Sequence, residues 1–298
     1  MHSVISKKHT RAMARPSSCP PSRLLVGLPK KTPYLRFMNM RRLEEDVVAQ
    51  SRRSGSDPRE SPFLVVFDVP PSMSELLENS PSDFQKHHTV LDKREQILVI
   101  ETMVSNPHET AAVEFGNQLY SKVRSMGLKP LSTGCSTVEE GNYRKEPDGS
   151  WWPEKKHRAE MSHQWPNVVL EVGYAERDAK LAIDAQGWLE AAGSTVQIAI
   201  TVKIDRTTPQ IHIKAWEPSY IGRGTRSNRP KARVKQDIWV THANGASRAS
   251  DTLELDFEKI FDRPRNPAKP QEQNVIFSKE DLVDLAEDVW FFQNMVEA

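Results

Sequence analysis

The stretch Asn167-Val168-Val169-Leu170-Glu171-Val172-Gly173 is a continuous apolar run that a single carboxylate interrupts. Continuous apolar character is typical of a strand covered on both faces, and therefore of a central strand in a sheet. Period-two geometry places Val169 and Glu171 on one face and Leu170 and Val172 on the other. An isolated ionised carboxylate there costs several kcal/mol. We therefore expect Glu171 to pair with a cation or with backbone N–H donors near the strand end, or to bind a metal ion.

Helical and strand patterns alternate on both sides of this run. Asn106 suits a helix cap and Pro107 the first helical position, and apolar residues then recur at helical spacing as far as Gly127. Val196–Ile204 alternates apolar and polar residues, and a second short strand at Ile211–Trp216 follows after a turn, which predicts a hairpin. The other expected elements are strands at Phe63–Val69, Gln96–Val104, Cys135–Tyr143, Tyr143–Trp152 and Leu253–Phe257, and helices at Asp178–Ala192 and after the capping residue Ser278. This order indicates one sheet domain of the α/β class, with α+β as the alternative.

Charge is distributed unevenly along the chain. The 298 residues carry 41 Lys+Arg and 40 Asp+Glu, so the formal net charge is +1. Residues 1–42 hold ten basic and no acidic side chains (+10), which leaves 31 basic and 40 acidic side chains (−9) for the remainder. The basic segment is rich in proline and lacks a sustained apolar period, which is typical of disorder. We expect a basic, disordered tail at 1–59 and a single domain at 60–298, with its core at about 106–216.

The tail has three interpretations that stay open. It is a solvated segment, a loose contact with nucleic acid or another anion, or a mitochondrial transit peptide, although its prolines disfavour the amphipathic helix of such peptides. The longest apolar runs are shorter than the roughly 18–20 residues of a membrane-spanning helix. Cys19 and Cys135 form no Cys-X-X-Cys or Cys/His cluster, which favours a reducing compartment. We expect an intracellular protein without a membrane partner, cytoplasmic or nuclear, with a mitochondrial location and the oligomeric state left open.

A second acid makes a metal site at Glu171 worth considering. Asp148 lies in Pro147-Asp148-Gly149, with 22 residues between the two carboxylates. Pro-Asp-Gly is also a common turn sequence. Two hard oxygen ligands on adjacent strands can hold Mg²⁺ and leave positions for water and phosphate. Such an ion would lower the pKa of a bound water and neutralise charge that develops on a phosphodiester.

The segments Lys145–Pro153, Pro166–Tyr174 and Asp184–Leu189 resemble the PD-(D/E)XK restriction-endonuclease-like superfamily. More narrowly, they are similar to uncharacterised fungal proteins that pair a Pro-Asp segment with a Val-Glu-Val-Gly strand. The resemblance spans roughly Asn106–Trp216. It implies a core of helix, three strands, helix and strand, here with added strands and a C-terminal helix.

The resemblance also implies a site. Mg²⁺, with Mn²⁺ as the second candidate, would be bound by Asp148, Glu171 and the backbone carbonyl of Val172. A glutamate on the first helix sometimes joins these ligands in the superfamily, and Glu114 is the candidate for that position.

The sequence departs from the superfamily at the motif lysine, because the position two residues after Glu171 is Gly173. A lysine from elsewhere can take over this role, since the role is electrostatic. Lys180, in the first turn of the following helix, is the candidate catalytic residue, and Lys203 is the second candidate. Both are also interpreted as solvated surface lysines, and Lys180 with Asp184 has the spacing of an i,i+4 pair. If neither lysine reaches Glu171, we expect a site without catalytic function.

These observations favour a Mg²⁺-dependent, nuclease-like phosphodiesterase that acts on nucleic acid through Asp148 and Glu171. The alternative is a catalytically inactive interaction or binding protein with the same fold. A hydrolase site needs the two carboxylates within about 4–6 Å of each other. The inactive alternative predicts that Asp148 faces away or that a Lys or Arg fills the space between them. The negative charge outside the tail argues against avid, sequence-independent DNA binding.

Overall fold

The structure is a computed structural model, and it describes residues 22–57, 59–81, 84–132, 134, 136–153, 165–174, 177–220 and 230–296. The chain divides into two compact units. Of the described residues, unit 1 contains Ser22 and Lys30–Met103, and unit 2 contains Arg23–Pro29 and the residues from Val104 onward. Both cysteines lie outside the described residues.

Unit 1 is a small sheet with two α-helices. Its elements are β1 (Tyr34–Arg36), α1 (Met40–Ser56), β2 (Phe63–Phe67), α2 (Met73–Glu78), the 3-10 helix η2 (Phe84–Lys86), β3 (His88–Asp92) and β4 (Ile97–Glu101). Strand β1 is parallel to β2, and β4 pairs antiparallel with both β2 and β3. Helix α1 follows the cap residue Asn39, whose side chain accepts a hydrogen bond from the Arg42 N–H. It buries Leu43 and Val47 in the apolar cluster of this unit.

Unit 1 differs from the domain organisation expected from the sequence. Strand β1 and helix α1 lie inside the region 1–59, where the sequence predicts a disordered tail. The i,i+4 pair Leu43 and Val47 gives α1 its buried side, but charged residues surround the pair and hide the pattern. Residues 60–298 are not a single domain either, because β2, β3 and β4 belong to unit 1. The expected tail at 1–21 lies outside the described residues.

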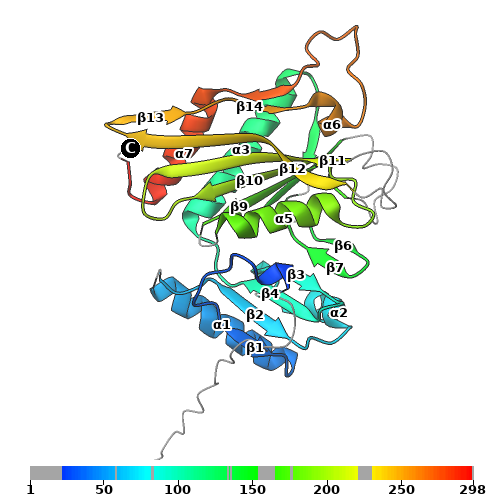
Figure 1. Ribbon diagram of the computed structural model, residues 1–298, viewed down its shortest axis with the longest axis vertical. Coiled ribbons are helices and arrows are strands. Elements are labelled where there is room, and N and C mark those ends of the chain that lie inside the picture. Colours follow the sequence, from blue (N-terminus) through cyan, green and yellow to red (C-terminus); the bar gives the residue numbers. More distant parts are fainter. Residues whose placement is uncertain are drawn as a thin grey trace, which may run out of the picture. The chain divides into compact units, whose positions relative to one another are not determined.

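Unit 2 is built around a larger sheet (Figure 1). In chain order its elements are η1 (Arg23–Leu25), α3 (Asn106–Ser125), β5 (Pro130–Ser132), β6 (Val138–Glu140), β7 (Tyr143–Lys145), β8 (Gly149–Pro153), β9 (Val168–Gly173), α5 (Asp178–Glu190), β10 (Ile198–Ile204), β11 (Gln210–Ser219), β12 (Lys231–Ala243), β13 (Ala246–Ala249), β14 (Leu253–Leu255), α6 (Phe257–Phe261), β15 (Val275–Phe277) and α7 (Lys279–Phe292). The strand order of the sheet is β13-β12-β11-β10-β9-β8-β5, with β9 and β10 parallel and the other neighbours antiparallel. Figure 1 shows α5 on one face of this sheet and α3 with α7 on the other.

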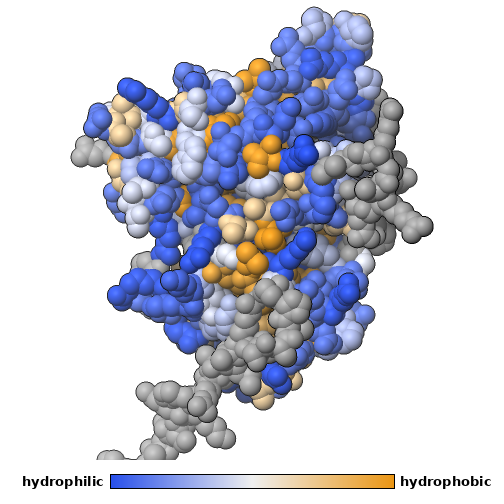
Figure 2. Space-filling model, viewed as in Figure 1, coloured by the Kyte–Doolittle hydropathy of each residue, from blue (hydrophilic) through white to orange (hydrophobic). Residues whose placement is uncertain are grey.

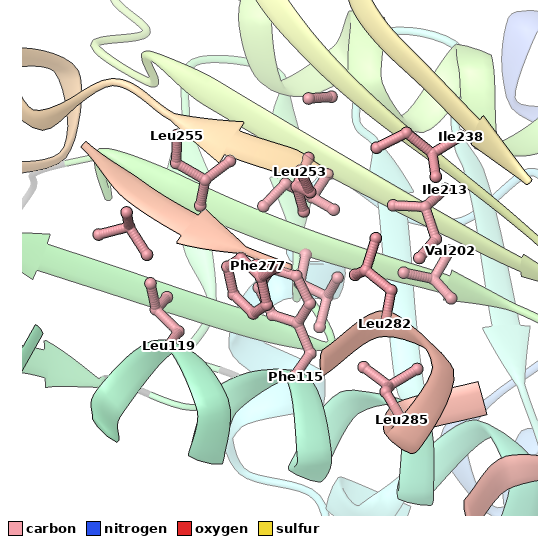
Figure 3. Packing of buried hydrophobic residues seen from close by; sticks show 14 of the residues in the cluster. Phe115, Leu119, Val202, Ile213, Ile238, Leu253, Leu255, Phe277, Leu282 and Leu285 are labelled. Carbon is pink, nitrogen blue, oxygen red and sulfur yellow. The ribbon is translucent and has the colours of Figure 1, made fainter. Parts of the chain in front are cut away.

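Strand β9 is the buried strand that its composition predicts. All six of its residues are buried. Leu170 and Val172 belong to the apolar cluster on the α3–α7 face, whereas Val169 belongs to the cluster under α5. Figure 3 shows Phe115 of α3 and Leu282 of α7 pointing into the first of these clusters. The assignment of alternate residues to opposite faces is therefore confirmed.

The fold class is confirmed as mixed α/β, with the predicted core order. Helix α3 is followed by the sheet strands β5, β8 and β9, then by α5 and β10, and the added strands and the C-terminal helix α7 follow. The predicted hairpin corresponds to β10 and β11. The sequence predicts two strands in 135–152, whereas the structure has β6, β7 and β8. Gly141, with a φ of 58°, turns the chain between β6 and β7. Pro147, which has no backbone N–H to donate to a strand ladder, lies between the end of β7 and the start of β8.

The surface of unit 2 is polar over most of the face drawn in Figure 2, and apolar residues reach it in small groups. Its apolar side chains are gathered instead in the two internal clusters of the sheet. None of the described helices has the length and the apolar character that crossing a membrane requires.

Candidate active site

Glu171 lies on the α5 face of β9. Its side chain is 9% exposed, and Trp188 of α5 donates the hydrogen of its indole Nε1 to Glu171 Oε1. A central strand thus carries a carboxylate into an otherwise apolar environment. Its charge requires a compensating partner.

Lys145, at the end of β7, is that partner. Its Nζ lies 2.8 Å from Glu171 Oε1 and 2.8 Å from Asp184 Oδ1, and its side chain is 2% exposed. The same Nζ lies 5.4 Å from the centre of the Trp188 ring, within the range of a cation–π contact. The ammonium group therefore bridges a strand carboxylate and a helix carboxylate in a dry environment.

Lys180 completes the cluster. Its Nζ lies 2.6 Å from both carboxylate oxygens of Asp184, so the two residues form the i,i+4 pair that their spacing predicts. Both side chains are buried, and the interpretation of Lys180 as a solvated surface lysine is wrong. We call Lys145, Glu171, Lys180 and Asp184 the charge network. It contains two ammonium groups and two carboxyl groups.

Burial and neighbouring charges act in opposite directions on these groups. Burial raises the pKa of Glu171 to about 7, although Lys145 opposes this shift, and the negative charges of Asp184 and Asp148 add to it. Burial would also raise the pKa of Asp184, but Lys145 and Lys180 outweigh it and hold that pKa below its usual value. Burial would lower the pKa of Lys145, but Asp184 and Glu171 reverse the effect and raise it. Lys145 therefore stays protonated at neutral pH.

A close approach between β7 and α5 brings Lys145 into the network. Tyr143 starts the three-residue strand β7, and its hydroxyl lies against Gly187 of α5, where an added Cβ would come within 2.7 Å of that oxygen. Only a residue without a side chain fits this space unless Tyr143 moves. Tyr143 thus places the start of β7 beside α5, and Lys145 follows two residues after it.

Asp148 is directed at β9. The β8–β9 ladder ends with Gly149 opposite Leu170, so Asp148 comes level with Glu171. Its backbone N–H donates to the Leu170 carbonyl at 3.1 Å, and its Oδ2 accepts the Val172 N–H at 2.6 Å. Asp148 Oδ2 also lies 3.2 Å from Nε2 of His108, a buried residue in the first turn of α3. Asp148 therefore does not face away from the strand.

The other residues proposed from the sequence lie apart from these contacts. Glu114 lies on α3, and its Oε1 accepts a hydrogen bond of 3.4 Å from Asn117. Lys203 lies opposite Gly173 in the β9–β10 ladder, but its Nζ donates to two backbone carbonyls, that of Tyr174 at 3.3 Å and that of Ile204 at 2.7 Å. Neither Lys203 nor Lys180, whose Nζ pairs with Asp184, contacts Glu171, which is the arrangement expected from the sequence for a site without catalytic function.

Sequence reasoning missed Lys145 and His108. Lys145 belongs to the Lys-Glu-Pro-Asp stretch that carries the superfamily resemblance, three residues before Asp148. Its place in the chain was visible, but its contact with Glu171 depends on how β7 packs on α5. His108 follows the predicted cap and first helical residue of α3, and only the fold brings it to Asp148.

The donors at this site suit a hard cation. Asp148, Glu171 and the carbonyl of Val172 offer oxygen atoms only, and Mg²⁺ is held in proteins by one or two carboxylates together with water. Among the residues that the structure describes, no three His, Cys, Asp or Glu side chains are grouped as a metal cluster. By their chemistry, these oxygen donors fit Mg²⁺ with a largely aqueous shell.

No protein-family model matches the chain, and no curated protein matches it either. Among solved structures, the chain is similar to the crystal structure of a candidate nuclease belonging to DUF820 from Anabaena variabilis. The sequence identity is 12% and the TM-score is 0.41, and the match covers 72% of this chain and 98% of that chain.

Proposed function

We propose that unit 2 is a nuclease-like phosphodiesterase that acts on nucleic acid and uses Mg²⁺, with Mn²⁺ as the second candidate ion. The observation that carries this proposal is the 2.8 Å separation between Lys145 Nζ and Glu171 Oε1. It brings a lysine to the glutamate although the motif position is Gly173. The resemblance of residues 106–216 to the PD-(D/E)XK superfamily, and to its fungal members, supports the same activity.

In this proposal Asp148, Glu171 and the Val172 carbonyl would hold the ion. When bound, Mg²⁺ supplies a water of lowered pKa and neutralises charge on the phosphodiester. Asp148 is oriented for this role by the Val172 N–H and by His108. Glu171 is oriented by Lys145 and by the Trp188 indole.

Lys145 takes the electrostatic role of the motif lysine. Because its neighbours keep it protonated, it does not serve as a base. A fixed ammonium group beside the scissile phosphate stabilises the negative charge of the transition state, and it does so more strongly in a dry site than in water. Lys180, the candidate from the sequence, acts on Asp184 and in this way holds the second carboxylate that fixes Lys145.

The alternative is a protein of the same fold that binds without cutting. Its supporting observation is the balance of the charge network, in which two ammonium groups already neutralise two carboxyl groups. Because its ammonium and carboxyl groups pair with one another, the charge network needs no metal ion, and a chain without catalytic activity could retain it.

A cleavage assay separates the two functions. The full chain and the variants Asp148→Asn and Glu171→Gln are incubated with single-stranded DNA, duplex DNA and RNA, in Mg²⁺, Mn²⁺ or EDTA. Nuclease function predicts metal-dependent cleavage that each substitution lowers by about 100-fold or more. The control is Asp251→Asn, which removes an exposed carboxylate elsewhere on unit 2. If the native chain cuts none of the substrates, the binding function stands, and cleavage that survives both substitutions places the site elsewhere.

A further inference from the structure

The charge network is closed to any ligand as large as a phosphodiester. The exposed fractions of its residues are 2% for Lys145, 7% for Glu171, 5% for Lys180 and 2% for Asp184. A phosphate group that is to contact either ammonium group must first displace something that covers it. The covering segments are therefore part of any function of this site.

One covering segment comes from far away in the sequence. Residues Arg23–Pro29, which we call the strap, lie between two segments of unit 1 in the chain but belong to unit 2. The carbonyl of Gly27 accepts a hydrogen bond of 3.1 Å from the backbone N–H of Arg177, directly before α5. Gly27 lies so close to Lys180 that an added Cβ would come 2.5 Å from its backbone nitrogen and 2.9 Å from its Cβ. The strap thus covers the helical turn that carries Lys180.

The form of this contact suits local opening. It is made by a short segment that includes the single 3-10 turn η1, and its hydrogen bond from Arg177 to Gly27 lies directly before α5. The strands of the sheet hold one another through ladders that do not include the strap. Opening of the strap exposes the two buried side chains Leu24 and Leu28 and breaks the Arg177–Gly27 hydrogen bond, whereas opening of a strand breaks a whole ladder.

We propose that the strap is a gate over the charge network, which opens locally to admit an anionic group of the substrate to Lys180 and Lys145. The identity of that substrate as a nucleic acid rests on the proposed function. The opening of the strap, and the access that it gives to the two lysines, do not.

Gly27 offers a selective way to open the gate. Its φ is 79°, a conformation that side chains disfavour, and an added Cβ also collides with backbone. Gly245, in the turn between β12 and β13, has a similar φ of 72° but nothing within 4 Å of an added Cβ. Gly27→Ala and Gly245→Ala therefore share the backbone strain, and only the first pushes the strap off α5.

Two measurements on the full chain report opening directly. Hydrogen exchange of the Arg177 amide reports the hydrogen bond to Gly27, and acylation by acetic anhydride, mapped by mass spectrometry, reports access to Lys145 and Lys180. Gly27→Ala is expected to accelerate both by about tenfold or more over wild type, and Gly245→Ala to leave both near the wild-type rate. Equal rates of exchange and acylation in the two variants would overturn the proposal that the strap is a gate.

The wild-type chain gives a test that does not depend on a variant that folds. In native-state exchange with low denaturant, the Arg177 amide should exchange by a local opening, well before the amide of Ile200 in β10. If both amides exchange in the same cooperative opening, the strap is an ordinary part of the folded unit and the proposal fails.

Cleavage assays separate this inference from the proposed function. If the wild type cuts nucleic acid, Gly27→Ala should cut faster than Gly245→Ala, and an unchanged or lower rate contradicts gating. If the wild type cuts nothing, the proposed function fails, and the acylation of Lys145 and Lys180 alone decides whether the strap controls access.

Discussion

The two faces of the sheet in unit 2 both carry apolar clusters, and they differ in the charges buried beside them. On the α3–α7 face, Leu170 and Val172 of β9 join a continuous apolar cluster that includes Phe115 and Leu285 (Figure 3). On the α5 face, the same strand presents Glu171 to Lys145, which also pairs with Asp184, and Asp184 in turn pairs with Lys180. One strand thus contributes a hydrophobic core on one side and a buried ionic network on the other.

The difference shows which face serves stability. Burial of apolar area stabilises a domain without further conditions. A buried ion network loses hydration that its internal attractions only partly restore, and well-packed apolar residues in its place are often neutral or stabilising. Apolar residues of similar volume could therefore take the place of the whole charge network without loss of stability, although removal of a single member leaves a buried charge without its partner.

The largest expected effect is the loss of Lys145. Lys145→Met leaves Glu171 and Asp184 buried beside one remaining ammonium group, and we expect the free energy of unfolding to fall by about 3–5 kcal/mol. Urea denaturation at neutral pH measures it. The matched control is Lys231→Met, because Lys231 pairs with Glu190 at the surface, with its own side chain 56% exposed, and such pairs contribute about 1 kcal/mol or less. Similar losses in both variants would contradict the burial of the network.

On the apolar face, a cavity should lower the free energy of unfolding about as much as the loss of Lys145 does, but by a different mechanism. Leu119 of α3 is fully buried in the cluster shown in Figure 3. Leu119→Ala is expected to lower the free energy of unfolding by about 3 kcal/mol through lost transfer energy and the residual cavity. The loss should not depend on pH between 5 and 8, since no charge is removed, and a strong pH dependence would count against a purely apolar face.

Removal of the charge of Glu171 should restore part of the free energy of unfolding that Lys145→Met loses. In the double variant Lys145→Met/Glu171→Gln, Lys180 again balances Asp184, so we expect a recovery of about 1–3 kcal/mol over Lys145→Met alone. A double-mutant cycle in urea measures this coupling. Additive losses would mean that Lys145 and Glu171 do not interact.

The pH dependence of stability should distinguish Glu171 from ordinary surface carboxylates. Burial raises its pKa from the usual 4.5 to about 7 in the folded chain. Between these values the folded state binds more protons than the unfolded state, so the contribution of Glu171 to the free energy of unfolding falls as pH rises and is constant above about 7. The stability of wild type relative to Glu171→Gln should therefore decrease from about pH 4.5 to about pH 7. A difference that stays constant or increases over that range would contradict a raised pKa for Glu171 in the folded chain.

The smallest effect is expected at the rim of the apolar face. Lys122 of α3 pairs with Asp281 of α7 at 2.6 Å, and both side chains are roughly a quarter to a third exposed. Lys122→Met should lower the free energy of unfolding by about 1 kcal/mol or less, because water already solvates both charges. The midpoint of thermal unfolding measures it, and a loss as large as that of Lys145→Met would erase the distinction between buried and exposed pairs.

The sequence predicts well what depends on local patterns. The alternating faces of β9, the cap and apolar spacing of α3, the β10–β11 hairpin and the capping box of Ser278 with Asp281 all appear in the structure. These features are determined by neighbours along the chain, so a single sequence contains them.

The remaining features depend on contacts between distant segments. Lys145 lies 2.8 Å from Glu171 through packing between segments that are apart in the chain, and the strap approaches Lys180 at a place where Gly27 has no side chain. Helix α1 was hidden for a different reason, since its buried residues are few and lie among charges. Neither the contacts nor the weak amphipathic pattern of α1 is visible in composition or spacing.

The central claim, that the ammonium group of Lys145 serves catalysis in addition to balancing two buried carboxyl groups, is tested most directly by one comparison of cleavage rates. The Mg²⁺-dependent cleavage of single-stranded DNA or RNA is measured for Lys145→Met and Leu119→Ala at a temperature at which both retain the same folded fraction. We predict a rate about 100-fold or more below wild type for Lys145→Met and a rate close to wild type for Leu119→Ala. Equal rates in the two variants would contradict a catalytic role for Lys145.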